Sequence, residues 1–350
     1  MLIAVDRNSK ELMNKYKEHK FIYIFENETL EDLSKIDVDC YNIKHFNSKV
    51  DINVTKYNID CIKTTDLNDK NLLDIPFKKD YKFALIIPNF NNDHGEYNGK
   101  TYFQNCIESV LNQTYKDFKL IIIDDMSTDT SVDTVKSYKD DRIILIQNKR
   151  KHYNGGSRNV GIEYVVNNLP DTDYIGFLDS DDWWKHSKVL ETINNTLYDD
   201  DMLMLGLECI NKDGIFLTKI NQWDNDLELF ESNNKVWCTS WSRIIKKDKI
   251  AYFCEDTLME DRVWSYRQTN NINTKKVRNL KEVCYVWNRM NTSNSVSLTR
   301  SPIWDYSAYC HIGHQGILLQ EITNPEYRKF IEQRIKECKS KVNNNTFMQY

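Results

Sequence analysis

Short apolar runs alternate with segments of helical spacing over the middle of the chain. The unbroken apolar runs lie at residues 83–87, 120–123, 143–146 and 174–178, and the helix-like segments lie at 103–113, 131–138 and 157–166. Continuous runs of Ile, Leu and Val are typical of parallel strands that are buried on both faces. The pattern therefore predicts an α/β domain with a Rossmann-like, largely parallel sheet flanked by helices.

The first part of the chain follows a weaker version of this pattern. Apolar runs at Leu2–Val5 and Phe21–Phe25 enclose a polar, helix-like stretch from Ser9 to Lys20, which predicts a small α/β appendage. The stretch Asp66–Lys79 is polar and contains Pro76, as linkers often do. We expect an appendage at 1–78, a main domain at 79–300 and a helical C-terminal extension at 301–350.

Composition and charge indicate an ordinary globular protein. Hydrophobic residues make up 40% and charged residues 28% of the 350 residues, so the chain can bury a core. The formal net charge of -5 does not favour nucleic acid as a partner. The basic cluster Lys149–His152 is predicted to be a solvated loop, with contact to a diphosphate or a polymeric acceptor as the alternative.

The cysteines and the N-terminus indicate a cytoplasmic protein. Nine cysteines occur without a Cys-x-x-Cys pair, and an odd number cannot all be joined internally, so reduced thiols are expected. Asp6 and Arg7 interrupt any signal-peptide core, and no apolar stretch approaches the ~20 residues that cross a bilayer. We expect no membrane span.

Polar side chains follow three of the predicted strands directly. They are Pro88 to Asn91 after the first strand, Asp124 and Asp125 after the second, and Asp179 to Asp182 after the fourth. Ligands of such sheets bind outside the C-terminal strand ends, so these residues should converge. Clustered carboxylates repel one another unless a cation lies between them, and oxygen ligands suit Mg²⁺ or Mn²⁺. The substrate implied by such a metal is a diphosphate.

Spacing alone does not identify the metal site. The pattern Asp-x-Asp occurs five times, at 37/39, 171/173, 179/181, 199/201 and 224/226. Only the 179/181 pair directly follows a predicted buried strand, which favours a metal site over a solvated turn. A calcium-binding loop is disfavoured because Leu190 stands where a bidentate Glu is needed.

At this point the residues resemble a known family. The segment Ser109–Phe118, running on into Ile123, Asp124 and Asp125, closely resembles the opening βαβ segment of the family 2 glycosyltransferases with the GT-A fold. Three further segments agree in order and spacing: Ser157–Gly161, Phe177–Asp182 and Glu260–Asp261. The resemblance spans about residues 82 to 297 and implies a GT-A type mixed sheet and an inverting, nucleotide-sugar-dependent enzyme.

The resemblance also implies a nucleotide site. Pro88 and Phe90 would flank the base, which is usually uracil, and Asp125, or less commonly Asp124, would accept its NH group. Phe90 stands where Tyr is common in the family, Met126 where Gly is common, and the loop after Phe90 is longer than usual. These departures concern base binding and leave the class of enzyme unchanged.

The catalytic roles follow from the same resemblance. Asp181, with Asp179, would hold Mn²⁺ or Mg²⁺ against the diphosphate, while Arg158 and Ser180 would lie near the nucleotide. Asp261 would be the general base that takes the proton of the acceptor hydroxyl. The alternative for Asp261 is an exposed acid in the first turn of a helix.

An acceptor or sugar pocket is expected beside these residues. Its candidate members are Asp182, Trp183, Trp184, Trp241 and Glu260. Core packing explains the tryptophans almost as well, and Arg243 near Trp241 would then be a surface residue. His311 and His314 are interpreted as residues of a helix surface, although some GT-A enzymes use a late histidine on the metal.

The sequence therefore predicts a glycosyltransferase that moves a sugar from a nucleotide diphosphate, with a UDP-sugar favoured, to an acceptor hydroxyl. The acceptor classes left open are a surface glycan, a lipid-linked sugar, a protein and, least favoured, a modified DNA base. One alternative function is a sugar-nucleotide or glycan-binding module without turnover. The other is a nucleotidyltransferase, which would need a Gly-rich, Lys-bearing loop where this chain has Pro88–Asn92.

Overall fold

The computed structural model describes residues 2–5, 20–23, 80–149, 153–231, 239–257, 260–290 and 302–343. The chain forms two compact units, Met1–Asp80 and Tyr81–Tyr350. In the first unit β1 (Leu2–Val5) and β2 (Lys20–Tyr23) pair in parallel. The predicted helix between them, like the predicted linker, lies outside the described residues.

One half of the main sheet is entirely parallel, as the apolar runs predict. The strands lie in the order β7 (Ile143–Gln147), β6 (Phe118–Asp124), β3 (Phe83–Asn89) and β8 (Tyr174–Phe177). Phe83 is in register with both Phe118 and Tyr174. Pairing of β3 and β6 continues to Asn89 and Asp124, because a ladder of backbone hydrogen bonds tolerates polar side chains at its end.

The other half makes the nine-stranded sheet mixed. It continues with β12 (Arg243–Lys246), β10 (Met202–Asn211), β13 (Val277–Asn288) and β9 (Trp183–Trp184), and β11 (Gly214–Lys219) also pairs with β10. Strand β12 is antiparallel to β8 and β10, whereas β13 is parallel to β10. The predicted mixed, partly parallel sheet is thus confirmed.

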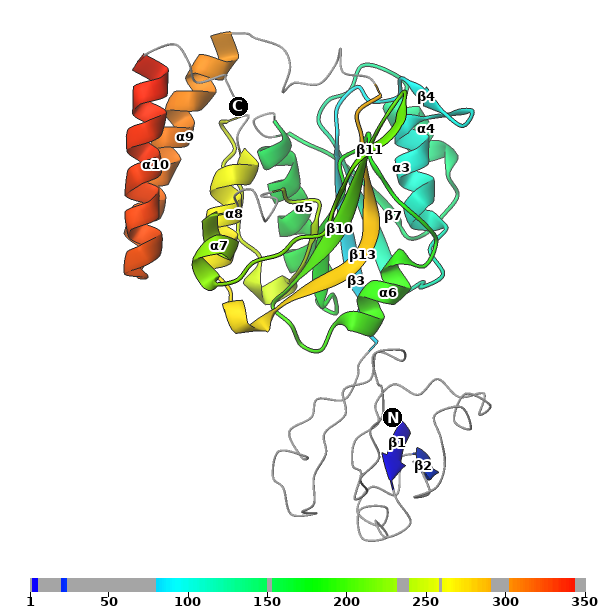
Figure 1. Cartoon of the computed structure of the whole chain (residues 1–350). Helices are drawn as coiled ribbons and strands as arrows, with labels where there is room; N and C mark the ends of the chain where they lie inside the picture. Colours follow the sequence, from blue (N-terminus) through cyan, green and yellow to red (C-terminus); the bar gives the residue numbers. More distant parts are fainter. Residues whose placement is uncertain are drawn as a thin grey trace. The chain divides into compact units, whose positions relative to one another are not determined.

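Helices cover both faces of the sheet (Figure 1). Side chains of β3 alternate between two cores, with Phe83, Leu85 and Ile87 in one and Ala84 and Ile86 in the other. The first core includes α3 (Tyr102–Leu111) and α6 (Val189–Thr196), with α4 (Ser131–Ser137) at its rim, and the second includes α5 (Asn154–Asn168). A Cβ at Gly161 would lie 2.6 Å from the Ile86 side chain, so α5 approaches β3 closely.

A two-residue hairpin precedes α3. Strands β4 (Glu96–Tyr97) and β5 (Lys100–Thr101) are joined by Asn98 and Gly99, whose φ angles are 55° and 76°. Asn-Gly is the pair that favours such a turn, because both residues tolerate the left-handed region. The loop after Phe90, which is longer than is usual in the family, thus contains this hairpin.

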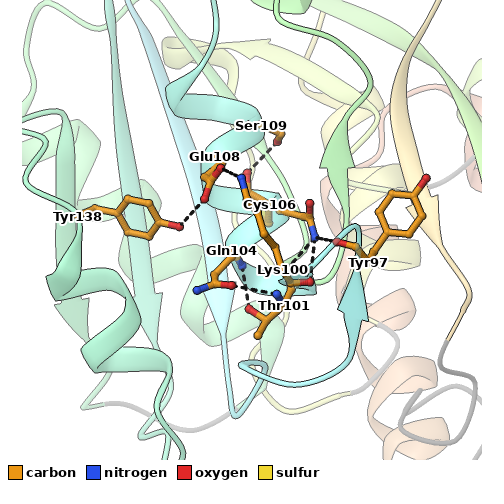
Figure 2. Close-up of polar contacts among 9 residues, drawn as sticks. Tyr97, Lys100, Thr101, Gln104, Cys106, Glu108, Ser109 and Tyr138 are labelled. Carbon is orange, nitrogen blue, oxygen red and sulfur yellow. Dashed lines mark hydrogen bonds and ion pairs between the residues drawn. The ribbon is translucent and has the colours of Figure 1, made fainter.

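The end of the hairpin is also the start of α3. Thr101 forms a capping box with Gln104, and the Asn105 side chain donates hydrogen bonds to the carbonyl oxygens of Tyr97, Lys100 and Thr101 (Figure 2). Thr101 Oγ1 also donates to Asp93 Oδ1 at 2.8 Å. Helix and hairpin are therefore held as one piece.

A helical layer completes the C-terminal side. It consists of α7 (Asp226–Glu231), α8 (Glu260–Asn270), α9 (Pro302–Glu321) and α10 (Pro325–Asn343), with short 3₁₀ helices at Lys247–Lys249 and Thr274–Lys276. The predicted helical C-terminal extension is confirmed: α9 packs beside α8, and α10 packs against α9 and α7 (Figure 1). Phe230 stacks on Tyr327 with centroids 4.0 Å apart. Within the described residues, no helix has the length and apolar character needed to cross a bilayer.

Changing Thr101→Ala should lower the free energy of unfolding by about 1 to 2 kcal/mol, because it removes the N-cap of α3 and the hydrogen bond to Asp93. Urea denaturation followed by circular dichroism measures this loss. Thr101→Ser keeps the hydroxyl and should retain most of the stability. Equal losses in the two variants would contradict the role of the cap.

Candidate functional site

The C-terminal ends of β3, β6 and β7 are tied together by backbone hydrogen bonds. The Asp125 N–H donates to the Asn89 carbonyl at 2.7 Å, and the Asn148 N–H donates to the Asp124 carbonyl at 2.8 Å. Asp124 is buried, and its carboxylate accepts from the Asn89 side chain and from the Ser127 N–H. Both carboxylate oxygens of Asp124 thus accept hydrogen bonds from the strand end and the loop that follows it.

Asp125 is held in one orientation. Its Oδ1 accepts from Asn148 Nδ2 at 2.9 Å, and its Oδ2 accepts from the Tyr153 N–H at 3.2 Å. Asn148 is fully buried and also donates to Ser157 Oγ at 3.0 Å. Each carboxylate oxygen can accept more than one hydrogen bond, so Asp125 keeps capacity for a ligand N–H.

The sequence-based prediction missed Asn148. It follows β7 directly, as Asp124 and Asp125 complete and follow β6. The same rule about strand ends would have found it.

Apolar side chains lie exposed beside these strand ends. Phe90 follows β3 and is 59% exposed, while Met126 follows Asp125 and is 47% exposed. Pro88 is buried within β3. Met126 has a φ of 65°, in the left-handed region where Gly is favoured, which costs on the order of 1 kcal/mol. The backbone at Met126 thus keeps the left-handed conformation that favours Gly, the residue common at this position in the family, although the residue here is Met.

A buried arginine joins three elements. Arg158, in the first half of α5, donates from Nη2 to Asp179 Oδ1 at 2.6 Å and from Nη1 to Glu260 Oε1 at 2.7 Å. Its guanidinium also lies over the Phe253 ring, 5.3 Å from the centroid. Burial disfavours its charge, but the two carboxylates hold the pKa of Arg158 above its ordinary value.

The start of α5 packs closely against the segment before α8, which brings Arg158 within reach of Glu260. A Cβ at Gly155 would lie 2.1 Å from the Cys254 carbonyl oxygen, in the segment that precedes α8. Any larger residue would push α5 away from this segment. Gly155 therefore lets Arg158 reach Glu260.

Acidic groups outnumber cations around Arg158. Burial and the charge of Asp179 raise the pKa of Asp181 to about 6; its side chain is accessible to solvent, but protein surrounds it on most sides. Burial raises the pKa of Glu260 to about 7, against the attraction of Arg158 and with a contribution from Asp261. Burial likewise raises the pKa of Asp261, although Arg158 and Arg262 oppose this. Such a cluster gains stability by binding protons or a cation.

The donor set fits a small divalent cation. Asp179 and Asp181 offer carboxylate oxygens, which Mg²⁺ and Mn²⁺ prefer. Across the described part of the chain, no three His, Cys, Asp or Glu residues are grouped so that they could hold an ion by themselves. A site with one or two protein carboxylates and substrate oxygens is the arrangement that Mg²⁺ typically takes.

The neighbours of this pair are structural. Asp182 is buried, and its carboxylate accepts from Tyr285 Oη at 2.7 Å and from the Asn288 N–H at 2.8 Å. Burial and the charge of Asp181 raise the pKa of Asp182. Ser180 Oγ accepts from Asn92 Nδ2 at 2.9 Å. Asp182 is therefore shielded from solvent and holds β13 through these two hydrogen bonds.

The predicted tryptophans separate into core and surface. Trp184 and Trp241 are buried in one core, and Trp241 stacks on Tyr285 with centroids 4.4 Å apart. Arg243 is fully buried, so its interpretation as a surface residue was wrong: β12, which contains it, is a central strand. Trp183 keeps part of its surface exposed and stacks on Tyr97.

The helix-surface interpretation of His311 was wrong as well. His311 is buried beside Gln315, because both lie on the covered face of α9, and His314 is half-buried with Nε2 2.5 Å from Asp256 Oδ1. Asp261 is half-buried at the start of α8. Lys149 is exposed, and the other three residues of the basic cluster lie outside the described residues.

Comparison with known proteins indicates a family. The profile described as "Glycosyl transferase family 2" matches residues 84–255. Poly(ribitol-phosphate) beta-N-acetylglucosaminyltransferase TarP of Staphylococcus aureus is 30% identical over 239 residues, which are 63% of this chain and 67% of TarP. The UDP-Glc:alpha-D-GlcNAc-diphosphoundecaprenol beta-1,3-glucosyltransferase WfaP of Escherichia coli is 40% identical over 98 residues, or 28% of this chain.

Coverage of the first curated relatives is partial. The chain spans 37% of WfaP and 49% of its E. coli counterpart WfgD. Among solved structures, S. aureus TarS 1-349 in complex with UDP aligns with a TM-score of 0.49 and 17% identity, over 74% of this chain and 71% of that chain.

The raised pKa of Glu260 predicts a pH dependence of stability. Because this pKa is about 7 in the folded chain and 4.5 for an ordinary Glu, the folded chain binds more protons than the unfolded chain between these values. The free energy of unfolding should therefore fall as pH rises from 4.5 through 7, by on the order of 3 kcal/mol from this group. Glu260→Gln should flatten this slope.

Urea titrations of the metal-free protein at a series of pH values measure the slope. Glu332→Gln changes an exposed acid on α10 and serves as the matched control, which should keep the wild-type slope. Parallel curves for wild type and Glu260→Gln would refute the assignment.

Proposed function

Because the chain belongs to the family 2 glycosyltransferases, with their GT-A fold, we propose that it transfers a sugar from a UDP-sugar to an acceptor hydroxyl with inversion at the anomeric carbon. The observation that carries the proposal is the buried Arg158, which joins Asp179 of the proposed metal pair to Glu260 beside the proposed base. One hydrogen-bonded unit therefore links the donor side to the acceptor side of a single reaction. The relatives named as UDP-glucose-dependent transferases support a UDP-sugar donor.

In this proposal the nucleotide lies at the ends of β3 and β6. The exposed Phe90 ring offers a flat apolar face to the base beside Pro88, and Asp125 accepts a base N–H in the orientation that Asn148 imposes. Asp124 is the less favoured acceptor, because it is the more deeply buried of the two. Ser180 lies at the boundary between base and diphosphate.

Asp179 and Asp181 would hold Mn²⁺ or Mg²⁺. When bound, such an ion stabilises the negative charge that develops on the departing diphosphate. Arg158 pairs with Asp179 in the described structure, so we assign it to positioning Asp179 within the acidic cluster. Asp181, which faces solvent, is the carboxylate best able to meet a ligand.

Asp261 acts as the general base. Its raised pKa makes its carboxylate a better proton acceptor than an ordinary Asp, while the neighbouring Arg158 and Arg262 keep it ionised. As the acceptor oxygen bonds to the anomeric carbon, the bond from that carbon to the diphosphate oxygen breaks. The hydroxyl proton passes to Asp261, and UDP leaves with the electron pair.

The acceptor is proposed from the relatives. Their names give a diphosphoundecaprenol-linked GlcNAc in two E. coli proteins and poly(ribitol-phosphate) in the S. aureus protein. We propose an acceptor of this kind, a lipid-linked sugar or cell-surface polymer, over a protein or a modified nucleic acid. The cytoplasm remains the proposed location, from the nine scattered cysteines.

UDP with Mn²⁺ should raise the melting temperature by about 5 °C at saturating ligand, because binding to the folded state alone stabilises it. Differential scanning fluorimetry measures the shift. Asp125→Ala should weaken the effect of UDP, and ADP with Mn²⁺ should act weakly on the wild type. No shift with any nucleoside diphosphate and metal would overturn the nucleotide site.

Changing Asp261→Asn should lower kcat by about 10² to 10⁴, because the amide cannot accept the proton, and should leave the UDP-induced melting shift unchanged. Mass spectrometry of products from a panel of UDP-sugars measures transfer. Asp213→Asn alters an exposed turn and is the matched control. Full activity of the Asp261 variant would remove it as the base, and nucleotide binding without turnover in the wild type would favour a binding module.

A further inference from the structure

The β4–β5 hairpin is held rigidly beside the acidic run, which is the segment Asp179–Asp182. Asp93, at the start of the hairpin loop, accepts hydrogen bonds from the hydroxyls of Thr101, Thr130 and Thr134 at 2.8, 2.7 and 2.6 Å. Asn105 of α3 fixes the hairpin backbone by donating hydrogen bonds to the carbonyl oxygens of Tyr97 and Lys100. A loop tied to two helices in this way presents its side chains in one geometry.

Helix α3 also contacts the acidic run directly. Cys106 Sγ lies 3.4 Å from the Asp179 carbonyl oxygen, and Ser109 Oγ accepts from the Trp184 N–H at 3.1 Å. The hairpin therefore has a fixed position relative to Asp179 and β9.

An aromatic pair spans the two segments. The Tyr97 ring points away from the polar contacts of α3 (Figure 2) and stacks on Trp183, with centroids 5.0 Å apart and planes 18° apart. Both side chains are half-exposed, unlike the buried Trp184. Trp183 lies two residues beyond Asp181, and its backbone pairs with Val286 of β13. The pair is thus next to the carboxylate assigned to the donor diphosphate.

We propose that the stacked pair of Tyr97 and Trp183 offers its outer aromatic face as a platform on which a sugar ring of the acceptor stacks, so that the acceptor is a ring sugar and not an open-chain polyol phosphate. This rests on the proposed glycosyltransferase function. The face of an aromatic ring is apolar and carries partial negative charge, which suits the C–H face of a pyranose. An extended polyol offers no such face.

Charge around the platform acts in the same direction. Glu96 is exposed on the hairpin next to Tyr97. Lys100, the hairpin cation, is paired with Glu108. A polymer with repeating phosphates would bring anions against Glu96, which is unfavourable.

Position in the sheet assigns the platform to the acceptor. The proposed nucleotide site lies at β3 and β6, and the proposed metal pair follows β8. Strand β9, which contains Trp183, is the terminal strand at the opposite end of the sheet order from β7 and β6. In the order of the sheet, β8, β12, β10 and β13 lie between β9 and the two strands proposed to bind the base of the donor.

The test uses Tyr97→Ala and Trp183→Ala, with Tyr97→Phe as the conservative variant and Tyr309→Ala, an exposed tyrosine on α9, as the matched control. The acceptor probe is a short-chain lipid diphosphate carrying α-GlcNAc, and the open-chain probe is a ribitol phosphate oligomer. Saturation-transfer NMR in the presence of UDP and Mn²⁺ reads contact with ring protons. Steady-state kinetics give the KM of acceptor and donor.

We expect saturation of the GlcNAc ring protons in the wild type, and its loss in both alanine variants. Acceptor KM should rise about tenfold, while donor KM and acceptor-free hydrolysis of the UDP-sugar stay unchanged. Tyr97→Phe and Tyr309→Ala should behave as wild type. Unaltered ring contact in the alanine variants, a parallel rise in donor KM, or preferential binding of the ribitol phosphate oligomer would overturn the platform.

Failure of the proposed function would look different. Ring-proton contact that depends on Tyr97, without any transfer by the wild type, would support the platform and reject the enzymatic activity. Sugar transfer by the wild type, together with an unchanged acceptor KM in the alanine variants, would support the enzymatic activity and reject the platform.

Discussion

The buried Arg158 is the interaction on which the arrangement of the site depends. One guanidinium joins the end of β8 to the start of α8, through Asp179 and Glu260, and is itself carried by α5. Three elements far apart in sequence therefore share one cation. Its removal would leave two carboxylates facing each other without a partner in a buried region, which is far more costly than losing an exposed pair.

The surplus of acid around this arginine explains the chemistry that the site supports. Asp181, Glu260 and Asp261 all have raised pKa values, because burial disfavours their charge and one arginine cannot compensate them all. The same surplus suits a divalent cation at one end and a proton acceptor at the other. Arg158 keeps these two ends at a fixed separation.

The hairpin at residues 96–101 adds a feature that a common α/β scaffold does not require. Its turn is formed by Asn98 and Gly99 alone, but its proposed role depends on Trp183, which belongs to β9. Asp93 ties it to α4, and Asn105 ties it to α3, the helix that contacts Asp179. Rigidity of this kind is useful where a ring must be held against a flat surface.

The sequence by itself determined the parallel strands, the alternation of helices and strands, and the polar residues at the strand ends. The first two depend on local hydrophobic periodicity, and the third follows from the rule that ligands bind outside the C-terminal ends of parallel strands. Only the tertiary structure decided that Arg158 lies between two carboxylates, that Asn148 orients Asp125, and that Trp241, Arg243 and His311 are buried. Burial and pairing arise between segments far apart in the sequence, 102 residues for Arg158 and Glu260 and 106 residues for Asp182 and Asn288, and no local pattern records such pairings.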